Sequence, residues 1–446
     1  MDRRMRTSTY WSKAFAALMG LTAFCAGNAR PQQSSPTEFG PSPELPAPDE
    51  KWLPSIHIAK AKGWGGDGVP KGAAGTTVAA LARGLKHPRW LYVLPNGDVL
   101  VAESDAPPRP DDGKGIAGKI GEYVMKRAGS GVRPSANQIT LLRDSVGDGT
   151  HVERHVFLQG LNSPIGMALI GSNFYVADSD ALLRFPYKTG DTEIRAQSML
   201  VATLPGGTIN HHWTKSLIAS ADGKMLYVGV GSNSNVAENG LEAESERAAV
   251  WEVNPDNGAH RIYASGLRNP AGLAWEPLSG VLWVSVNERD ELGDHLPPDY
   301  MTGLHDGAFY GWPFSYYGQH VDVRVKPQNS ALVAKAIVPD YALGAHTASL
   351  GLCWSGGSKL PLPFAEGMFV GQHGSWNRKE RSGYKVIFIP FTNGKPSGAP
   401  IDVVTGFLSA KDEALGRPVG VAIDKRGELL IADDVGDAVW RVSAAN

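Results

Sequence analysis

A two-part hydrophobic pattern recurs six times along the chain. Each copy has an apolar stretch, a turn containing Gly, Asn or Asp, and a second apolar stretch that in most copies ends in a small or acidic residue. The copies are Trp90–Glu103, Ile165–Asp178, Ser216–Gly229, Ala271–Ser285, Leu350–Gln372 and Val419–Asp433. Short apolar runs bounded by turn residues are typical of β-hairpins. We therefore expect six antiparallel hairpins.

A third apolar stretch follows most hairpins and makes each unit a β-meander. These stretches are Lys119–Met125, Ala181–Tyr187, Ala249–Asn254, Tyr384–Phe391 and Ala438–Ser443. The last unit has only three strands, and an unassigned stretch, Thr76–Leu81, precedes the first unit. Pairing the two would close a ring and remove an exposed sheet edge. The pattern predicts an all-β fold, a six-bladed β-propeller over residues 76–446, with a pair of β-sandwiches as the alternative.

The composition agrees with this prediction and argues against a nucleic-acid partner. The 446 residues include 53 Gly and 31 Pro, and only 20% are charged, as expected for many short strands joined by turns. The formal net charge is −2, so there is no basic excess to attract nucleic acid. We expect a small-molecule ligand and no nucleic-acid partner.

The N-terminus has the features of an export signal. Three arginines lie within the first six residues and precede the apolar stretch 14–26, which is too short to span a bilayer. We expect a signal peptide over residues 1–29, cleaved after Ala29, and a periplasmic or secreted protein. Lipid anchoring at Cys25 is the less favoured alternative, because the bulky Phe24 precedes it.

The mature chain is then expected to begin with a Pro-rich extension, residues 30–75, that links the signal to the propeller. Cys353 is the cysteine that remains after cleavage, so no internal disulfide is expected. No stretch of the mature chain has the run of about 18 apolar residues that a transmembrane span needs.

Polar residues gather at one end of the predicted hairpins. The start of a first strand and the end of a second strand lie at the same end of an antiparallel pair. The segments found there begin at His87, Asn162, His211, Arg268, His346 and Arg417 before first strands, and at Glu103, Asp178, Ser232, Asn287, His373 and Asp433 after second strands. These groups should ring the central channel and form a binding site. The turns at the other end are interpreted as structural.

Three arginines on this face point to bound anions. Arg268, Arg378 and Arg417 would repel one another unless a negative group lies among them, since guanidinium keeps its proton and prefers carboxylate or phosphate partners. A bound anion is one explanation. Neutralisation by the protein's own acids is the other, with Glu103, Asp178 and Asp434 as candidates.

Four motifs on these loops resemble the glucose/sorbosone dehydrogenase family, in particular its L-sorbosone dehydrogenase-like branch. They are HWTKSL from His212, GLRNPAGLAW from Gly266, YGWP from Tyr310 and HGSWNR from His373. The resemblance covers roughly residues 76–446. It implies a six-bladed propeller that binds pyrroloquinoline quinone (PQQ) with calcium, oxidises a sugar and passes the electrons to an external acceptor.

The resemblance also implies roles for individual residues. His212 matches the catalytic base, and an imidazole suits that task because its unperturbed pKa is near working pH. Arg268 and Asn269 match the pair that contacts the quinone oxygens, where a cation stabilises the charge that arrives with hydride. The further cofactor contacts expected on this basis are Arg378, Arg417, Lys215 and Trp376.

Calcium is expected in the loop 287–294. By resemblance its ligands are the backbone carbonyls of Glu288 and Arg289 and the acid Asp294, since hard cations prefer oxygen ligands. The alternative is a solvated charged loop. The chain departs from the family at Ala271, where glucose dehydrogenases carry Gln, and at Asn287, where their His-Gly-Pro run is replaced.

The sequence thus favours a PQQ- and calcium-dependent dehydrogenase that oxidises an aldose, pyranose or ketoaldose by hydride transfer. A metal-dependent lactonase is a second hypothesis, for which Glu103, Asp178 and Asn233 could supply ligands. A propeller that only binds a partner is the third.

Overall fold

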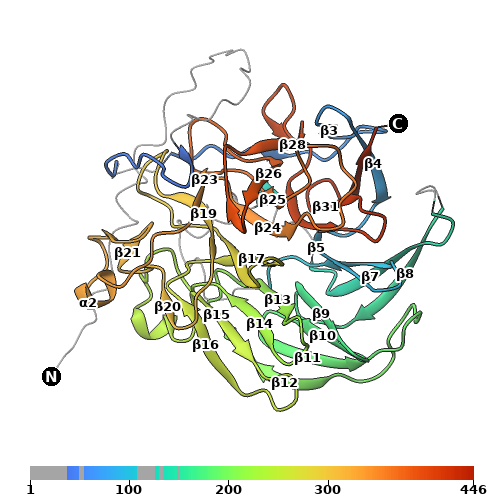
Figure 1. Cartoon of the computed structure of the whole chain (residues 1–446), viewed down its shortest axis with the longest axis horizontal. Helices are drawn as coiled ribbons and strands as arrows, with labels where there is room; N and C mark the ends of the chain where they lie inside the picture. The colour runs from blue at the N-terminus through green and yellow to red at the C-terminus, as the bar shows by residue number, and fades with distance from the viewer. Residues whose placement is uncertain (1–37, 50–54, 108–125, 130–133, 148–150, 446) are drawn as a thin grey trace.

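Six β-sheets, antiparallel except for one short edge strand, surround a central axis in the computed structural model of the chain (Figure 1). The structure describes residues 38–49, 55–107, 126–129, 134–147 and 151–445. The all-β, six-bladed prediction is confirmed. The expected signal peptide lies outside the described residues. Within the described part of the chain, no helix combines the length and the hydropathy needed to cross a membrane.

The blades follow one another along the chain. Blade 1 consists of β5 (Pro88–Val93), β6 (Val99–Glu103), β7 (Gln138–Asp144) and β8 (Val152–Gln159). Blade 2 consists of β9 (Gly166–Ile170), β10 (Asn173–Ala177), β11 (Ala181–Pro186) and β12 (Met199–Thr203). Blade 3 consists of β13 (Lys215–Ala219), β14 (Leu226–Val230), β15 (Ala249–Val253), β16 (His260–Ser265) and β20 (Ala308–Phe309).

The remaining blades take in strands from the N-terminal part of the chain. Blade 4 consists of β17 (Pro270–Glu276), β18 (Val281–Val286), β19 (Pro298–Gly303), β23 (Tyr341–Ala345) and β1 (Phe39–Gly40). Blade 5 consists of β24 (Ser349–Trp354), β25 (Gly367–Gln372), β26 (Lys385–Thr392), β28 (Ile401–Thr405) and β3 (Lys71–Gly72), with β27 (Lys395–Pro396) paired to β26. Blade 6 consists of β30 (Pro418–Ile423), β31 (Leu429–Asp433), β32 (Ala438–Ala444) and β4 (Thr76–Arg83).

Short elements lie in the loops between the blades. They are β2 (Lys60–Ala61) paired with β29 (Glu413–Ala414), β21 (Ser315–Tyr316) paired with β22 (His320–Val321), the 3-10 helix η2 (Leu241–Glu244) and the helix α2 (Ser330–Val333).

The ring closes as the sequence predicts. Strand β4 pairs antiparallel with β32, with Thr76 opposite Ala444 and Arg83 opposite Ala438. The first strands of the blades, β5, β9, β13, β17, β24 and β30, contact one another in order around the axis. An N-terminal strand therefore completes the last blade, and that sheet has no free edge where the two meet.

Glycines in the first strands let neighbouring blades approach closely. A Cβ at Gly166 would lie 2.5 Å from the backbone nitrogen of Leu217, and one at Gly351 would lie 2.2 Å from the carbonyl of Val419. Gly272 and Gly420 meet the next blade in the same way. No larger residue fits these positions without moving the backbone. This explains the glycine near the start of four of the six hairpin repeats.

The third strand of blade 1 differs from the prediction. The sequence pattern favoured Lys119–Met125, which lies outside the described residues, but the strand paired with β6 is β7, Gln138–Asp144. Both stretches are apolar enough to be strands, and the long connection between β6 and β7 separates the hairpin from its partner. The periodic pattern alone does not show which of the two pairs.

Part of the Pro-rich extension packs on the propeller. Strand β1 pairs with β23, and β3 pairs with β28. Both strands add to the outer edges of blades 4 and 5. The described part of the extension is therefore held by backbone hydrogen bonds and carries side chains into defined positions.

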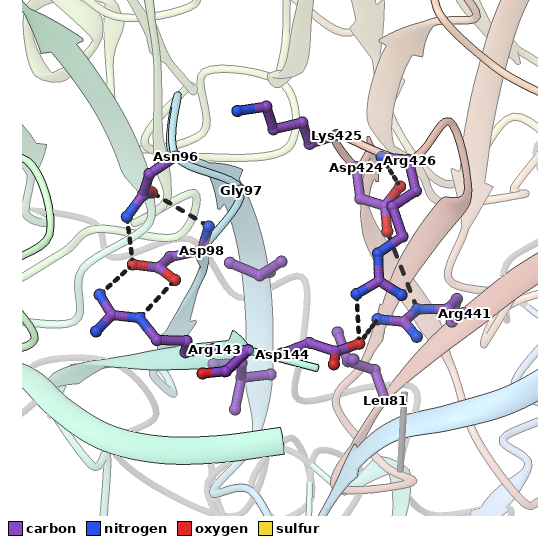
Figure 2. A pocket seen from close by; sticks show the side chains of 13 residues that line it. Leu81, Asn96, Gly97, Asp98, Arg143, Asp144, Asp424, Lys425, Arg426 and Arg441 are labelled. Carbon is purple, nitrogen blue, oxygen red and sulfur yellow. Dashed lines mark hydrogen bonds and ion pairs between the residues drawn. The ribbon is translucent and has the colours of Figure 1, made fainter. Parts of the chain in front are cut away.

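A charged pocket of about 330 Å³ lies at the turn end of the sheets, between blades 1 and 6. Figure 2 shows Arg143 against Asp98, and both Arg426 and Arg441 against Asp144. The arginine side chains thus have carboxylate partners from the protein. The contacts of Asp144 join the first blade to the last, so this pocket is a structural junction, in agreement with the interpretation of the turns.

Candidate functional site

The opposite end of the sheets carries the residues singled out in the sequence. His212, Arg268 and Arg417 lie just before the first strands β13, β17 and β30, and residues 287–290 and 373–378 follow the second strands β18 and β25. Antiparallel pairing puts these loops at one end of the molecule. The predicted common face is therefore present.

His212 is held as a neutral imidazole with one nitrogen available. Its Nδ1 lies 2.9 Å from the carbonyl oxygen of Ser232, which can only accept, so Nδ1 carries the proton. The side chain is partly exposed. Burial of the ring lowers the pKa of His212 well below its usual value, and the positive charge of Arg268 lowers it further. The Nε2 atom therefore keeps its lone pair near neutral pH, as a general base requires.

Asn269 lies beside His212 because Gly231 separates them without a side chain. A Cβ at Gly231 would be 2.4 Å from Cβ of His212 and 2.6 Å from Oδ1 of Asn269. The Oδ1 atom of Asn269 is buried and has no hydrogen-bond partner among the described residues. A buried amide oxygen without a partner is costly for the protein alone. The geometry is consistent with a group that binds between these residues.

Arg268 is fixed by oxygens from two loops. Its Nη1 donates to the carbonyl of Glu288 at 2.6 Å, and its Nη2 donates to Oδ1 of Asn235 at 2.9 Å and lies 3.3 Å from Oδ2 of Asp290. The residue is 4% exposed. The guanidinium is thus oriented by the protein itself, and one of the three rim arginines is partly neutralised by an internal acid.

Two of the three expected calcium ligands, the Glu288 carbonyl and the Asp294 carboxylate, have partners within the protein. The Glu288 carbonyl receives Arg268, and the Asp294 carboxylate accepts from the Ser55 hydroxyl at 2.7 Å and from the backbone of Lys379. Arg289 is buried with its guanidinium against Asp322. A carbonyl oxygen has two lone pairs, so the Glu288 carbonyl keeps a second acceptor position beside its bond from Arg268. Calcium binding by the two carbonyls and Asp294 stays a prediction.

Asp290 is the acid of this loop that reaches the site, and the sequence did not single it out as a ligand. Its Oδ1 accepts from Nδ2 of Asn377 at 2.7 Å and lies 3.6 Å from Nδ1 of His346. Although burial opposes ionisation, His346 and Arg268 lower the pKa of Asp290 to about 2. The ion pair with Asp290 outweighs burial and raises the pKa of His346. Asp290 is therefore ionised, with Arg268 on one side and His346 on the other.

Arg378 is paired with an acid from the N-terminal extension. Its Nη1 lies 3.0 Å from Oε2 of Glu38 and its Nη2 lies 3.2 Å from Oε1, and Oε1 also contacts Nδ1 of His295. Both partners are buried. Internal neutralisation, one of the two explanations left open, accounts for Arg378. Its expected contact with a cofactor carboxylate stays a prediction.

Arg417 differs from the other two arginines. It is 3% exposed, donates to the Tyr384 hydroxyl at 3.1 Å and lies 5.0 Å from the centre of the Tyr384 ring. Within the part of the chain that the structure describes, it has no ion pair with a carboxylate. A buried guanidinium whose charge is not balanced favours an anionic ligand. Arg417 is the rim arginine that best fits the expected anion.

A second charged cluster lies next to Arg417. Asp434 accepts from Nη1 of Arg89 at 2.6 Å and from Nε2 of His373 at 2.9 Å. Despite burial, which acts in the opposite direction, His373 and the cations around it hold the pKa of Asp434 well below its usual range. The predicted acid Asp434 therefore neutralises Arg89, not Arg417. Arg89 in turn lies 5.8 Å from the ring centre of Trp213, next to His212.

Two further expected cofactor contacts have separate positions. Lys215 is fully buried, and its Nζ donates to the backbone carbonyls of His212 and Trp213, so it supports the turn that presents His212. Trp376 is 37% exposed at the rim, and its carbonyl accepts from the backbone of His57. Direct contact of either residue with a cofactor stays a prediction.

The acids suggested for a lactonase are not gathered around a metal position. Glu103 is engaged by Thr140, Gln138 and the backbone of Lys86. Asp178 is buried, and burial raises its pKa to about 7. Over the ranges that the structure describes, no group of three or more His, Cys, Asp or Glu side chains could hold a metal ion. The geometry does not favour this hypothesis.

Comparisons with known proteins agree with the fold. The chain is 27% identical over 300 residues to an uncharacterized protein of Borreliella burgdorferi, which covers 63% of this chain and 76% of that protein. It is 23% identical over 360 residues to a pyrroloquinoline quinone-dependent pyranose dehydrogenase of Coprinopsis cinerea, which covers 71% of this chain and only 44% of that enzyme. It is 23% identical over 181 residues to an aldose sugar dehydrogenase of Escherichia coli, covering 38% of this chain and 47% of the relative.

Solved structures show the same architecture at low sequence identity. The holo form of the Coprinopsis cinerea pyranose dehydrogenase PQQ domain superposes with a TM-score of 0.67 at 19% identity, covering 86% of this chain and all of the domain. A calcium structure of a Trichoderma reesei family AA12 enzyme gives the same TM-score at 17% identity, covering 88% of this chain and 99% of that chain. The family model described as TrAA12-like matches residues 133–297 and 319–445, well over half of the sequence. The chain therefore belongs to the TrAA12-like family.

Proposed function

We propose that this protein is a PQQ-dependent sugar dehydrogenase that oxidises the hydroxyl of an aldose, pyranose or ketoaldose. The observation that carries the proposal is the arrangement of His212. Its Nδ1 proton is committed to Ser232, its pKa is lowered, and its Nε2 is left to accept a proton beside Asn269 and Arg268. A base with this protonation state suits removal of a hydroxyl proton at neutral pH.

The residues around His212 suit an anionic quinone. Asn269 has a buried oxygen without a partner, and Arg417 is a buried cation without an ion pair among the described residues. Arg268 and Asn269 would lie against the quinone oxygens, and Arg417 would hold a carboxylate of the cofactor. When bound, PQQ supplies the acceptor for the hydride that leaves the sugar carbon.

The protein's own residues would prepare this transfer in three ways. His212 would take the hydroxyl proton at Nε2 while Ser232 holds its ring in the required tautomer. Arg268 would stabilise the negative charge that develops on the acceptor, because its guanidinium is already oriented. Lys215 would fix the turn carrying His212 through its two backbone contacts.

The names of two relatives support sugar oxidation as the class of reaction. A pyranose dehydrogenase and an aldose sugar dehydrogenase are among them, and both names denote sugar oxidation. We further propose export by the N-terminal signal and electron transfer to an external acceptor. We also propose that calcium binds in the loop 287–294, and the assay with and without calcium tests this part of the proposal. Whether the substrate is L-sorbosone-like is decided by the substrate series below.

Dye reduction by the purified protein tests the proposal. The protein is incubated with PQQ, with and without calcium, and assayed with D-glucose, other aldoses and L-sorbosone. We expect dye reduction that requires PQQ. The His212→Ala variant should lower kcat by about 10²- to 10⁴-fold, the usual scale for a lost general base.

His155→Ala is the matched control, because His155 lies on the outer strand β8 and contacts Glu153. Its turnover should equal that of the unmodified protein. Absence of any PQQ-dependent oxidation by the folded protein, or lactone hydrolysis without PQQ, would contradict the proposed function.

A further inference from the structure

We infer that Asp290 is a positioning residue for Arg268, and that it holds the guanidinium in the direction that the reaction needs. The inference rests on the proposed function, in which Arg268 faces the quinone. It concerns the acid that follows Glu288 and Arg289 in the loop 287–294, which the sequence motifs did not assign to any role.

Asp290 and Asn235 hold Arg268 together. The Nη2 atom of Arg268 lies 3.3 Å from Oδ2 of Asp290 and donates to Oδ1 of Asn235 at 2.9 Å. The same Asn235 oxygen accepts the backbone N–H of Asp290 at 2.8 Å. These three residues form a closed set of contacts. A rotation of the Arg268 side chain would break at least one of them.

Asp290 is itself fixed from the other side. Its Oδ1 accepts from Nδ2 of Asn377 at 2.7 Å and lies 3.6 Å from Nδ1 of His346, whose Nε2 is 2.8 Å from the carbonyl of Gly293. Asn235, Asp290 and Asn377 follow the second strands of blades 3, 4 and 5. Asp290 thus connects three successive blades on the face that carries His212: its backbone N–H donates to Asn235 of blade 3, and its carboxylate contacts Arg268 before blade 4 and Asn377 of blade 5. The direction of the Arg268 guanidinium therefore depends on how these blades are placed relative to one another.

The carboxylate has two opposing effects on Arg268. It fixes the direction of the guanidinium, and it also reduces the positive field felt by a group in front of it. The effect on the direction of the guanidinium should outweigh the effect on its field, since a displacement of about 1 Å at a reacting group can lower the rate by about 10²-fold. We therefore expect loss of the carboxylate to lower the rate even though it unmasks a cation.

The test compares Asp290→Asn with Asp306→Asn. Asp306 also forms a carboxylate–arginine contact, with Arg261, but on the exposed outer side of blade 3. Asp290→Asn removes a carboxylate–arginine contact at the site, and Asp306→Asn removes the same type of contact away from the site. Asp290→Glu is the conservative variant, because it keeps the carboxylate.

Three quantities are measured on each protein: the absorption band of bound PQQ, the dissociation constant of PQQ from a titration, and kcat with KM for the sugar. We expect Asp290→Asn to shift the PQQ band, to lower kcat by about 10- to 100-fold and to change KM for the sugar by less than about threefold. Asp290→Glu should recover part of kcat and the original band. Asp306→Asn should match the unmodified protein in all three.

The possible failures can be told apart. If the unmodified protein neither binds PQQ nor oxidises a sugar, the proposed function fails, and this inference fails with it. If the unmodified protein is active and Asp290→Asn has the same band and kcat, the inference alone is overturned. It is also overturned if Asp290→Asn and Asp290→Glu lose activity only in proportion to the fraction of unfolded protein, measured by circular dichroism.

Discussion

The carboxylate of Glu38 contacts both terminal nitrogens of Arg378, 340 positions later in the chain. Strand β1 begins at the next residue and pairs with β23 of blade 4. Arg378 directly follows Asn377, which contacts Asp290. The N-terminal extension therefore reaches the rim of the candidate site and balances one of its buried charges.

Removing this acid should destabilise the protein. Glu38→Ala leaves the buried Arg378 guanidinium without its carboxylate, and breaking a buried ion pair in this way costs about 3–5 kcal/mol. Urea unfolding measures the free energy of unfolding. Glu44→Ala is the control, because Glu44 is exposed in the same segment. A double variant, Glu38→Ala with Arg378→Met, should recover part of the lost free energy of unfolding. If Glu38→Ala were as stable as Glu44→Ala, the Glu38–Arg378 pair would not stabilise the fold.

Removing the charge of Arg417, in contrast to removing that of Glu38, should have little effect on the stability of the cofactor-free protein. Its charge has no ion pair in the described residues, so Arg417→Leu should change the free energy of unfolding of the cofactor-free protein by less than about 1.5 kcal/mol. PQQ affinity should fall by about 10- to 100-fold, the scale of a lost hydrogen bond to a charged group. Calorimetric titration with PQQ measures this. An unchanged PQQ affinity would show that Arg417 does not bind the cofactor.

Gly231 tests the approach of His212 and Asn269. Gly231→Ala places a methyl group within 2.4 Å of Cβ of His212 and 2.6 Å of Oδ1 of Asn269, so the two side chains must move apart. We expect kcat to fall by about 10²-fold, the effect of a displacement of about 1 Å at a catalytic group. Gly280→Ala serves as the comparison, since a Cβ there meets nothing within 4 Å, although its positive φ causes some local strain. Full activity of Gly231→Ala would argue against catalysis by this pair.

The pH dependence should report the lowered pKa of His212. A base works only when unprotonated, and burial together with Arg268 favours the neutral ring. Activity should therefore persist as the pH falls below 6.5 and should be lost only below the lowered pKa of His212. The profile of kcat/KM against pH measures the free enzyme. An acid limb at or above pH 6.5 would mean that another group titrates or that His212 is not the base.

The junction between the first and last blades predicts a pH-dependent stability. Burial raises the pKa of Asp144, but its contacts with Arg441 and Arg426 outweigh this and lower it (Figure 2). The stabilisation is present above the unfolded pKa and is lost as the pH falls through the lowered value. Asp144→Asn should cost about 1–3 kcal/mol at neutral pH. Asp402→Asn, which removes an exposed contact with Lys385, should cost less than about 1 kcal/mol.

The fold was predictable because it repeats. Six hairpins and the closing strand from Thr76 leave regular patterns of apolar residues and turns, and the structure confirms both. The third strand of blade 1 was not predictable, since Lys119–Met125 and Gln138–Asp144 have similar patterns and only tertiary pairing distinguishes them. The role of Glu38 was hidden for another reason: it lies in a Pro-rich segment whose composition gives no sign of a packed position.

The candidate site was predictable in its location but not in its pairings. Strand direction alone put His212, Arg268 and Arg417 at one end. Which acid balances which arginine depends on side-chain geometry across blades. Arg268 therefore meets Asp290, which was not among the predicted acids, and Asp434 meets Arg89 and not Arg417. The sequence also does not show whether Lys215 contacts a cofactor or supports the backbone of the turn before β13. A lysine can do either, and the structure shows the backbone contacts.

The most direct measurement is the absorption spectrum of the PQQ-loaded protein when sugar is added without oxygen or dye. We predict that the quinone band bleaches with about one equivalent of sugar in the unmodified protein and bleaches at least about 10²-fold more slowly in His212→Ala. A loaded, folded protein whose quinone band is unchanged by every sugar in the series, or that bleaches equally fast without His212, would contradict it.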